Sequence, residues 1–276
     1  MKIIHTHHPD SFRSLDTATL RRDFLLEGLF APGVIETRYW EVDRTVIGGA
    51  VPLGTPLKLE TATELKAATF CERRELGVVN LGGPGKVTAD GQVLALGKCD
   101  FAYVSRGTKE VLFSSDDPAA PATFYLLSYP AHTAHPTRKV ALADAIPTVI
   151  GTPETCNRRS IHKMIHAGGG PTCQLVMGFT TFAPGSIWNT LPPHTHERRS
   201  EVYLYFDVPA NQAVVHFLGQ PQETRHLIVR DKEAALSPGW SIHMGAGTAA
   251  YGFVWGMGGE NLDYADMDPA PLATLA

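Results

Sequence analysis

The sequence predicts an all-β protein built from two copies of one β-barrel or sandwich domain, with a few short helices. Two observations indicate this fold class. Short alternating runs of apolar residues, separated by turn residues, recur along the chain, and several short motifs recur in order at nearly one offset. The length of 276 residues suits one large or two ordinary domains.

The expected strands are short and evenly spread. Those of the first half are Gly77–Leu81, Gly85–Val87, Gln92–Leu96, Phe101–Val104, Glu110–Phe113 and Phe124–Ser128. Those of the second half are Leu175–Phe179, Glu201–Phe206, Ala213–Leu218, His226–Val229 and Tyr251–Trp255. Helical periodicity is found only near residues 14–27, where Gly28 suits a helix end. This pattern is typical of barrels and sandwiches.

An internal repeat supports the two-domain prediction. Glu-Arg-Arg occurs at 72–74 and, 125 residues later, at 197–199. Gly91-Gln92 and Gly219-Gln220 follow the two copies, so the matches form an ordered series. A cluster of proline and glycine near 148–157 marks the boundary. We therefore expect an N-terminal domain over 1–152 and a C-terminal domain over 153–276.

Composition and charge narrow the class of protein. Apolar residues make up 43% and charged residues 19% of the chain, and the net charge is −4. This balance predicts a globular protein and gives no reason to expect a nucleic-acid or membrane partner. No apolar run approaches the roughly 20 residues of a membrane span. The four cysteines lack a Cys-x-x-Cys pair, and the chain start lacks a secretory signal, so a cytoplasmic location is expected.

Four side chains in the second copy form a candidate metal site. His194 and His196 are two residues apart, so on a strand both imidazoles face the same side. A turn through residues 197–200 would return Glu201 to that side on the next strand, and His243 follows a turn at 237–242. Three imidazoles and a carboxylate suit Zn²⁺, Fe²⁺, Mn²⁺, Co²⁺ or Ni²⁺.

The repeat restricts this site to one domain. The first copy has Thr69-Phe70-Cys71 where the second has His194-Thr195-His196. Leu76 stands in the place of Glu201, and the position of His243 falls near Val111. The N-terminal domain is therefore expected to lack metal ligands and to be structural.

The metal motif and longer strings resemble known families. His-x-His, four residues, Glu and a later Pro-x-x-x-x-His resemble the metal motifs of cupins. The strings over 72–80, 193–203, 219–226, 240–243, 255–257, 259–261 and 266–268 resemble the 5-keto-4-deoxyuronate isomerase (4-deoxy-L-threo-5-hexosulose-uronate ketol-isomerase) family. This resemblance implies two cupin domains with the double-stranded β-helix fold. It also implies one Zn²⁺ per chain on His194, His196, Glu201 and His243, and a homo-hexamer.

The resemblance also implies a reaction. A small uronate, 5-keto-4-deoxyuronate from pectin or related polymers, becomes 3-deoxy-D-glycero-2,5-hexodiulosonate. This aldose–ketose isomerisation moves a proton between adjacent carbons, and a metal ion would act as a Lewis acid that stabilises the enediolate.

Several residues are candidates for contacts with this substrate. Alternation over Glu201–Asp207 predicts that Tyr203 and Tyr205 face a cavity. Glu223 and Tyr203 are candidates for proton transfer. Arg225, Arg199 and Tyr205 are candidates for substrate binding, since an arginine suits the carboxylate. Arg158 and Arg159 are interpreted as cross-links between domains or subunits.

Two alternatives use the same ligand pattern. A cupin dioxygenase would hold redox-active iron and would need access to oxygen. A non-catalytic cupin would bind sugar without turnover, although four retained ligands disfavour it.

Overall fold

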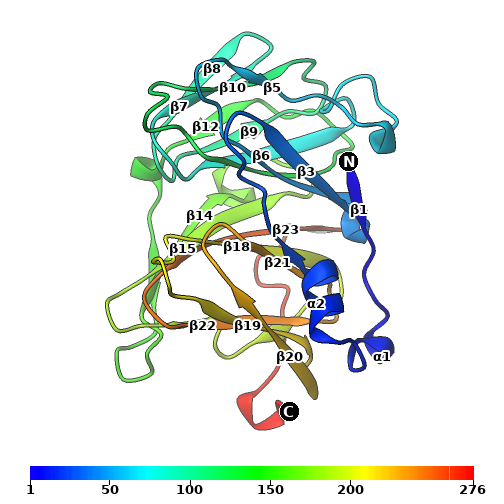
Figure 1. Ribbon diagram of the computed structural model, residues 1–276, viewed down its shortest axis with the longest axis vertical. Coiled ribbons are helices and arrows are strands. Elements are labelled where there is room, and N and C mark those ends of the chain that lie inside the picture. Colours follow the sequence, from blue (N-terminus) through cyan, green and yellow to red (C-terminus); the bar gives the residue numbers. More distant parts are fainter. Residues whose placement is uncertain (261) are drawn as a thin grey trace. The chain divides into compact units, whose positions relative to one another are not determined.

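The structure is a computed structural model that describes residues 1–260 and 262–276 (Figure 1). Asn261, which ends one of the strings that carry the family resemblance, lies outside the described residues. The described chain forms two compact units. The first contains Met1–Ile4, Gly28–Ala145 and Met164–Val176, and the second contains His5–Glu27, Ile146–Lys163 and Met177–Ala276.

The first unit contains two β-sheets. The larger runs in the order β1-β3-β4-β11-β6-β9-β12 and is antiparallel except where β1 joins β3. Its strands are β1 (Lys2–Ile4), β3 (Ile35–Trp40), β4 (Thr45–Ala50), β6 (Arg74–Asn80), β9 (Phe101–Val104), β11 (Phe124–Pro130) and β12 (Arg138–Val140). The smaller sheet, in the order β5-β10-β7-β8, comprises β5 (Leu57–Lys58), β7 (Gly85–Ala89), β8 (Gln92–Leu96) and β10 (Val111–Ser115).

The second unit is built around two sheets of the same sizes. The larger has the order β13-β14-β15-β23-β18-β21-β2. Its strands are β2 (Leu25–Leu26), β13 (Thr148–Ile150), β14 (Arg159–Ile165), β15 (Val176–Phe182), β18 (Arg199–Phe206), β21 (Ala234–Ser237) and β23 (Gly252–Gly259). The smaller, in the order β16-β22-β19-β20, comprises β16 (Trp188–Asn189), β19 (Val214–Gln220), β20 (Glu223–Val229) and β22 (Ile242–Gly247). A short pair joins β17 (His194–Thr195) to β24 (Asp268–Pro269).

The strand orders confirm the internal repeat. The run β4-β11-β6-β9 of the first unit matches β15-β23-β18-β21 of the second, and the smaller sheets match strand for strand. The two Glu-Arg-Arg motifs end at Arg74 and Arg199, which begin the equivalent strands β6 and β18. Two copies of one all-β domain are therefore present, as the sequence predicts.

The interior of the first unit is filled by apolar side chains. Leu76, Val78, Val87, Phe113 and Phe124 belong to one buried cluster. Leu76 is the third residue of β6, as Glu201 is of β18. The position equivalent to Glu201 is therefore taken by an apolar side chain of this cluster.

Helices are few and short, but their ends differ from the prediction. The α-helices are α1 (Pro9–Phe12) and α2 (Thr17–Phe24); the 3₁₀ helices are η1 (Val42–Arg44), η2 (Thr63–Leu65), η3 (Leu142–Asp144), η4 (Ala167–Gly169) and η5 (Leu272–Thr274). Helix α2 begins after Asp16, whose side chain accepts a hydrogen bond from the Thr19 amide. It ends at Phe24 rather than at Gly28, because Leu25 and Leu26 pair with β21 as strand β2.

Strands β3, β4 and β14 were not predicted. Strand β4 is buried along its whole length and contains Gly48 and Gly49, so it shows no polar alternation. Strand β14 mixes polar and apolar residues without a clear period of two.

Two further sequence expectations concern helices and cysteines. Among the described residues, none of the helices has the length and apolar character that crossing a membrane requires. None of the four cysteines forms a disulfide bond with another described residue.

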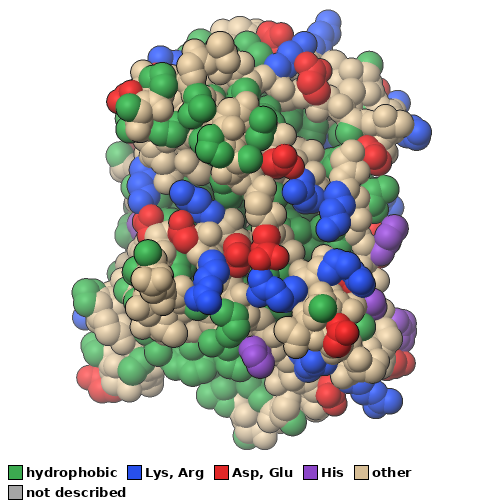
Figure 2. Space-filling model, in the orientation of Figure 1, with side chains coloured by type: hydrophobic (Ala, Val, Ile, Leu, Met, Phe, Trp, Pro, Cys, Tyr) green, Lys and Arg blue, Asp and Glu red, His purple; other side chains and the backbone are tan. Residues whose placement is uncertain are grey.

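On the face drawn in Figure 2, basic and acidic side chains are interspersed.

Candidate metal centre

Three short segments of the second unit carry the four predicted ligands. His194 begins β17, whose pairing with β24 sets it opposite Pro269. His196 follows β17, and its amide donates a 2.9 Å hydrogen bond to the Gly239 carbonyl. The chain bends at 197–198, and β18 has already begun at Arg199. The observed turn is therefore shorter than the predicted turn over 197–200. It still brings Glu201 to the face of the two histidines.

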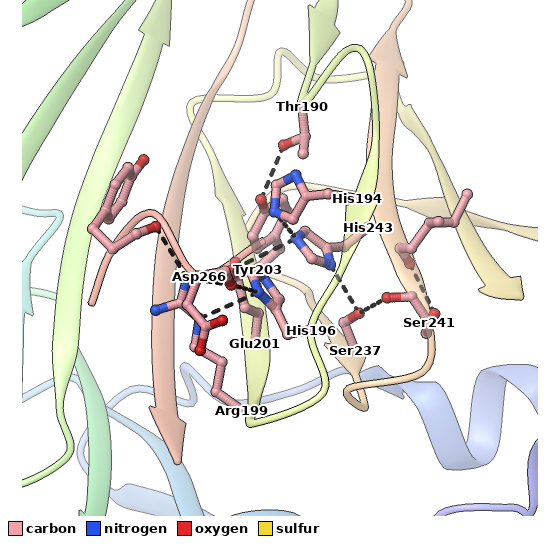
Figure 3. A network of polar contacts seen from close by, with 12 residues as sticks. Thr190, His194, His196, Arg199, Glu201, Tyr203, Ser237, Ser241, His243 and Asp266 are labelled. Atoms are coloured by element: carbon pink, nitrogen blue, oxygen red, sulfur yellow. Dashed lines mark hydrogen bonds and ion pairs between the residues drawn. The ribbon is translucent and has the colours of Figure 1, made fainter. Parts of the chain in front are cut away.

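The donor atoms of these side chains converge on one point (Figure 3). All four lie within 4.8 Å of one another. Glu201 Oε1 is 2.8 Å from His196 Nε2 and 3.6 Å from His243 Nε2. His243 Nε2 is 3.0 Å from His194 Nε2. His196, Glu201 and His243 are buried, and His194 is partly exposed toward a cavity.

Hydrogen bonds behind the cluster fix two of the imidazoles. His196 Nδ1 donates to the Asp266 carbonyl at 2.6 Å. His243 Nδ1 donates to Ser237 Oγ at 3.2 Å, while that hydroxyl donates to the Ser241 carbonyl. Protonation at Nδ1 leaves the Nε2 lone pair of each ring facing the cluster, which is the usual arrangement of metal-bound histidine.

Burial also sets the charge states of the cluster. It lowers the pKa of His194 to about 4 and the pKa of His243 well below its usual value. Burial by itself would raise the pKa of Glu201, but the imidazoles of His243 and His196 outweigh it and hold this pKa well below its ordinary range. At neutral pH His194 and His243 are therefore neutral and Glu201 is ionised, as metal ligands must be.

Three of the spacings between these atoms fit a bound divalent ion. Two atoms each about 2.0–2.1 Å from one zinc ion are about 3.0 Å apart at right angles and about 3.4 Å apart at the tetrahedral angle. The contacts of 2.8, 3.0 and 3.6 Å lie close to that range. Two imidazole nitrogens 3.0 Å apart need a shared proton or a shared cation between them. The described residues contain one such cluster of potential ligands.

The cluster opens on a cavity of about 360 Å³. Alternate residues of neighbouring strands, with loop residues around them, form its wall. The lining side chains are Ile150, Arg159, Ile161, Thr180, Thr190, Leu191, Pro192, His194, Arg199, Glu201, Tyr203, Phe253, Trp255, Met257, Tyr264 and Met267. This volume is within the roughly 300–1,000 Å³ of small-molecule sites.

The two predicted cavity tyrosines have different surroundings. The Tyr203 hydroxyl lies 2.9 Å from Thr190 Oγ1 in the cavity wall. Burial, followed by the charge of Glu201, raises its pKa well above the usual value, so Tyr203 remains a protonated donor. Tyr205 is buried and does not line the cavity; its hydroxyl is 2.7 Å from His216 Nδ1.

Of the remaining candidate residues, Arg199 lines the cavity, whereas Glu223 and Arg225 do not. Arg199 lines the cavity, but its guanidinium donates to the carbonyls of Asp263, Tyr264 and Asp266. Glu223 is an exposed residue of β20. Arg225, also in β20, donates to the Arg13 carbonyl. Neither of these two lines the cavity.

Several lining residues were missed by the sequence predictions. Arg159 and Trp255 both line the cavity. The Arg158-Arg159 pair is a visible sequence signal, but the sequence gives no indication that Arg159 lines the cavity rather than cross-linking domains or subunits. Trp255 lies inside a string that resembles the isomerase family, and only its strand register, opposite Tyr203, shows that it faces the cavity.

Comparisons with known proteins show the family of this chain. A family model described as the KduI/IolB family matches residues 31–271. Three relatives are named 4-deoxy-L-threo-5-hexosulose-uronate ketol-isomerase. That of Formosa agariphila is 52% identical over 267 residues, covering 97% of this chain and 95% of the relative. That of Kineococcus radiotolerans is 53% identical over 272 residues, covering 97% of each. That of Yersinia pseudotuberculosis is 49% identical over 277 residues, covering all of each.

Solved structures show the same fold at low sequence identity. An IolB-like protein from Salmonella typhimurium LT2 superposes with a TM-score of 0.72 at 14% identity, covering 87% of this chain and 94% of that one. An oxalate decarboxylase from Lactobacillus farciminis superposes with a TM-score of 0.57 at 12% identity, covering 88% and 89%. These likenesses confirm the cupin-like fold expected from the sequence.

Proposed function

This chain belongs to the KduI/IolB family, and on that premise we propose that it is a 4-deoxy-L-threo-5-hexosulose-uronate ketol-isomerase, as its relatives at 49–53% identity are named. The enzyme converts this 5-keto-4-deoxyuronate to 3-deoxy-D-glycero-2,5-hexodiulosonate in uronate degradation. The observation that carries the proposal is the four-ligand cluster at the wall of a cavity that also contains arginine and a protonated tyrosine.

The proposed resident metal is one Zn²⁺ per chain, held by His194, His196, Glu201 and His243. The neutral imidazoles of His194 and His243 and the ionised carboxylate of Glu201, at this spacing, support it. When bound, such an ion supplies Lewis acidity toward a carbonyl oxygen of the substrate.

The proposed roles of the protein side chains follow from their protonation and burial. The isomerisation takes a proton from the carbinol carbon and returns one to the neighbouring aldehyde carbon, with no net loss or gain of atoms. Tyr203, protonated and buried beside Thr190, is suited to donate a proton or hydrogen bond to a substrate oxygen. The apolar walls Phe253, Trp255 and Met257 limit access of water to the reacting atoms.

We also propose a division of labour and an assembly state. The N-terminal domain, residues 1–152, is structural, which its apolar interior supports. The C-terminal domain, residues 153–276, is catalytic. A homo-hexamer is proposed from the family resemblance, and light scattering would test it. The absence of disulfide bonds among the described cysteines supports a cytoplasmic location.

A turnover assay on the uronate, with and without a chelator, tests this function. Purified protein is expected to form the 2,5-diketo acid, to stop after chelation, and to resume after one zinc equivalent is added. Lack of turnover by zinc-loaded protein would contradict the proposal. Oxygen uptake with iron-loaded protein would instead support the dioxygenase alternative, and uronate binding without turnover would support the sugar-binding alternative.

A further inference from the structure

The cavity next to the metal cluster has an excess of positive side chains. Arg159 and Arg199 line it, and Glu201 is the carboxylate among its lining residues. Glu201 belongs to the metal cluster, where a divalent ion would more than balance its charge. The cavity is therefore electrostatically suited to an anionic ligand.

The two arginines differ in what their guanidinium groups already bind. Arg199 donates to three backbone carbonyls, those of Asp263, Tyr264 and Asp266, and so holds the chain that closes one side of the site. Arg159 donates one hydrogen bond, from Nη1 to the Asn157 carbonyl at 2.9 Å. Within the described ranges, 1–260 and 262–276, no carboxylate forms an ion pair with Arg159.

Arg159 is nevertheless buried, with 9% of its surface exposed. Burial is the main cause that lowers its pKa. A buried cation with unused planar donors is costly for a folded protein unless a ligand compensates it. A carboxylate is the group that best matches those donors, because it accepts two parallel hydrogen bonds from a guanidinium.

A second cavity residue also lacks an acceptor. The indole Nε1–H of Trp255 is buried and has no hydrogen-bond partner in the described structure. Trp255 is 3% exposed and lines the same cavity. A buried indole N–H normally has a partner, and that of Trp255 has none among the described residues.

Arg159 and the metal ligand Glu201 lie on different strands of the same sheet. Arg159 begins β14, and Glu201 lies on β18, three strand spacings away in the order β14-β15-β23-β18. Three spacings put the two strands about 14 Å apart across the sheet, and the offset along the strands adds to this separation. Both side chains extend into the cavity between them. A six-carbon chain spans about 6 Å, given carbon–carbon bonds of about 1.5 Å, and the proposal places it in the cavity between these two side chains.

We propose that Arg159 binds the carboxylate of the uronate, with the Trp255 indole N–H as a further donor to the substrate. The inference rests on the proposed function, since it concerns the substrate of the same site. In a hexuronate the carboxylate and the aldehyde are at opposite ends of the chain. Binding of the carboxylate at Arg159 therefore directs the aldehyde end toward the metal cluster.

The test compares the free uronate with its methyl ester, which keeps the aldehyde but carries no charge. Wild-type enzyme is expected to favour the acid in kcat/KM. Arg159→Met keeps an unbranched side chain but removes the guanidinium. It should lower kcat/KM for the acid roughly 10- to 100-fold, the effect of losing a hydrogen bond to a charged group. It should leave the rate with the ester nearly unchanged. The matched control is Arg158→Met, because Arg158 is the exposed neighbour and does not line the cavity.

Binding is measured separately from turnover. Calorimetric titration of the zinc-loaded proteins with the reaction product, which keeps the carboxylate, should show the same loss of affinity for Arg159→Met and none for Arg158→Met. Arg159→Lys keeps the charge but loses the planar fork, so it should retain part of the preference for the acid. Trp255→Phe, which removes only the N–H donor, should raise KM by a smaller factor. Zinc content and melting temperature report whether each variant folds.

The outcomes separate the two proposals. If the wild type turns over neither substrate, the proposed function is wrong. If it turns over the acid but Arg159→Met keeps the same preference for acid over ester, or slows both substrates equally, Arg159 does not bind the carboxylate. If Arg159→Met fails to fold, an unchanged KM and acid preference in Arg159→Lys would contradict the inference.

Discussion

The Nε2 atoms of His194 and His243 lie 3.0 Å apart, although 49 residues separate them in the sequence. Strand β17 supplies one ring and strand β22 supplies the other, and the rings meet nearly at right angles, at 88°. The fold itself therefore brings the ligands together.

Removal of the metal is expected to abolish turnover and to lower the melting temperature. At a free zinc concentration 100-fold above Kd, the bound ion adds about 2.7 kcal/mol to the free energy of unfolding. Differential scanning calorimetry with and without zinc measures this shift. The His243→Asn variant serves as the control and should show little shift. A wild-type melting temperature that is insensitive to zinc, together with turnover that resists chelation, would contradict the metal assignment.

Tyr203→Phe is expected to lower kcat by about 100-fold, at the lower end of what a positioned proton donor contributes. The variant loses only the hydroxyl. It keeps the ring, whose centroid lies 5.1 Å from that of the His243 imidazole. Its zinc content should therefore equal that of the wild type. Tyr125→Phe is the matched control, because Tyr125 is a buried tyrosine of the first unit. Unchanged kcat in Tyr203→Phe would exclude it as the donor.

Glu223→Gln is expected to retain wild-type turnover and zinc content. Glu223 is exposed on β20 and does not line the cavity, so the loss of its charge leaves the reacting atoms undisturbed. Steady-state kinetics beside a metal analysis measures both quantities. A loss of kcat with full zinc occupancy would restore Glu223 as the candidate base.

Ser237→Ala is expected to weaken zinc binding by 10- to 100-fold, as reported by a competing chelator. The variant removes the hydroxyl that accepts from His243 Nδ1 and leaves the ligand itself in place. Ser128→Ala is the matched control. Ser128 is also fully buried, but it bonds Arg74 and the Glu75 carbonyl in the first unit. Equal zinc affinity in wild type and Ser237→Ala would show that this hydrogen bond does not position the ring.

His216 is expected to make the protein sensitive to acid. Burial lowers its pKa to about 3, whereas an unfolded histidine titrates near 6.5. Above pH 6.5 the His216 imidazole is neutral in both the folded and the unfolded state. Its titration therefore does not change the free energy of unfolding there. As the pH falls from about 6.5 toward 3, the unfolded state takes up the proton first. The free energy of unfolding then decreases by up to about 1.4 kcal/mol per pH unit.

Urea unfolding of chelator-treated protein between pH 7 and pH 4 measures this effect. His216→Gln should lose less stability over that range than the wild type. His226→Gln should behave as the wild type, because His226 is exposed on the neighbouring strand β20. Parallel pH profiles for wild type and His216→Gln would contradict the assignment.

Much of the fold was predictable because its signals are local. Alternation identified β8 (Gln92–Leu96) and β9 (Phe101–Val104) with their observed bounds. Strand β4 was missed because it is buried on both faces, so its sequence does not alternate. The end of α2 was placed too late, because pairing of Leu25 and Leu26 with β21 outweighs the helical pattern.

The sequence by itself determined the all-β repeat and the four potential ligands, because His194, His196 and Glu201 are close in the chain and strand parity aligns them. Only the tertiary structure decided which other side chains share their cavity. Arg159 reaches it from β14, while Arg225, in a string that resembles the isomerase family, lies outside it. The physical reason is strand pairing: the order β14-β15-β23-β18 joins segments that are distant in sequence, and no local pattern encodes which strands become neighbours.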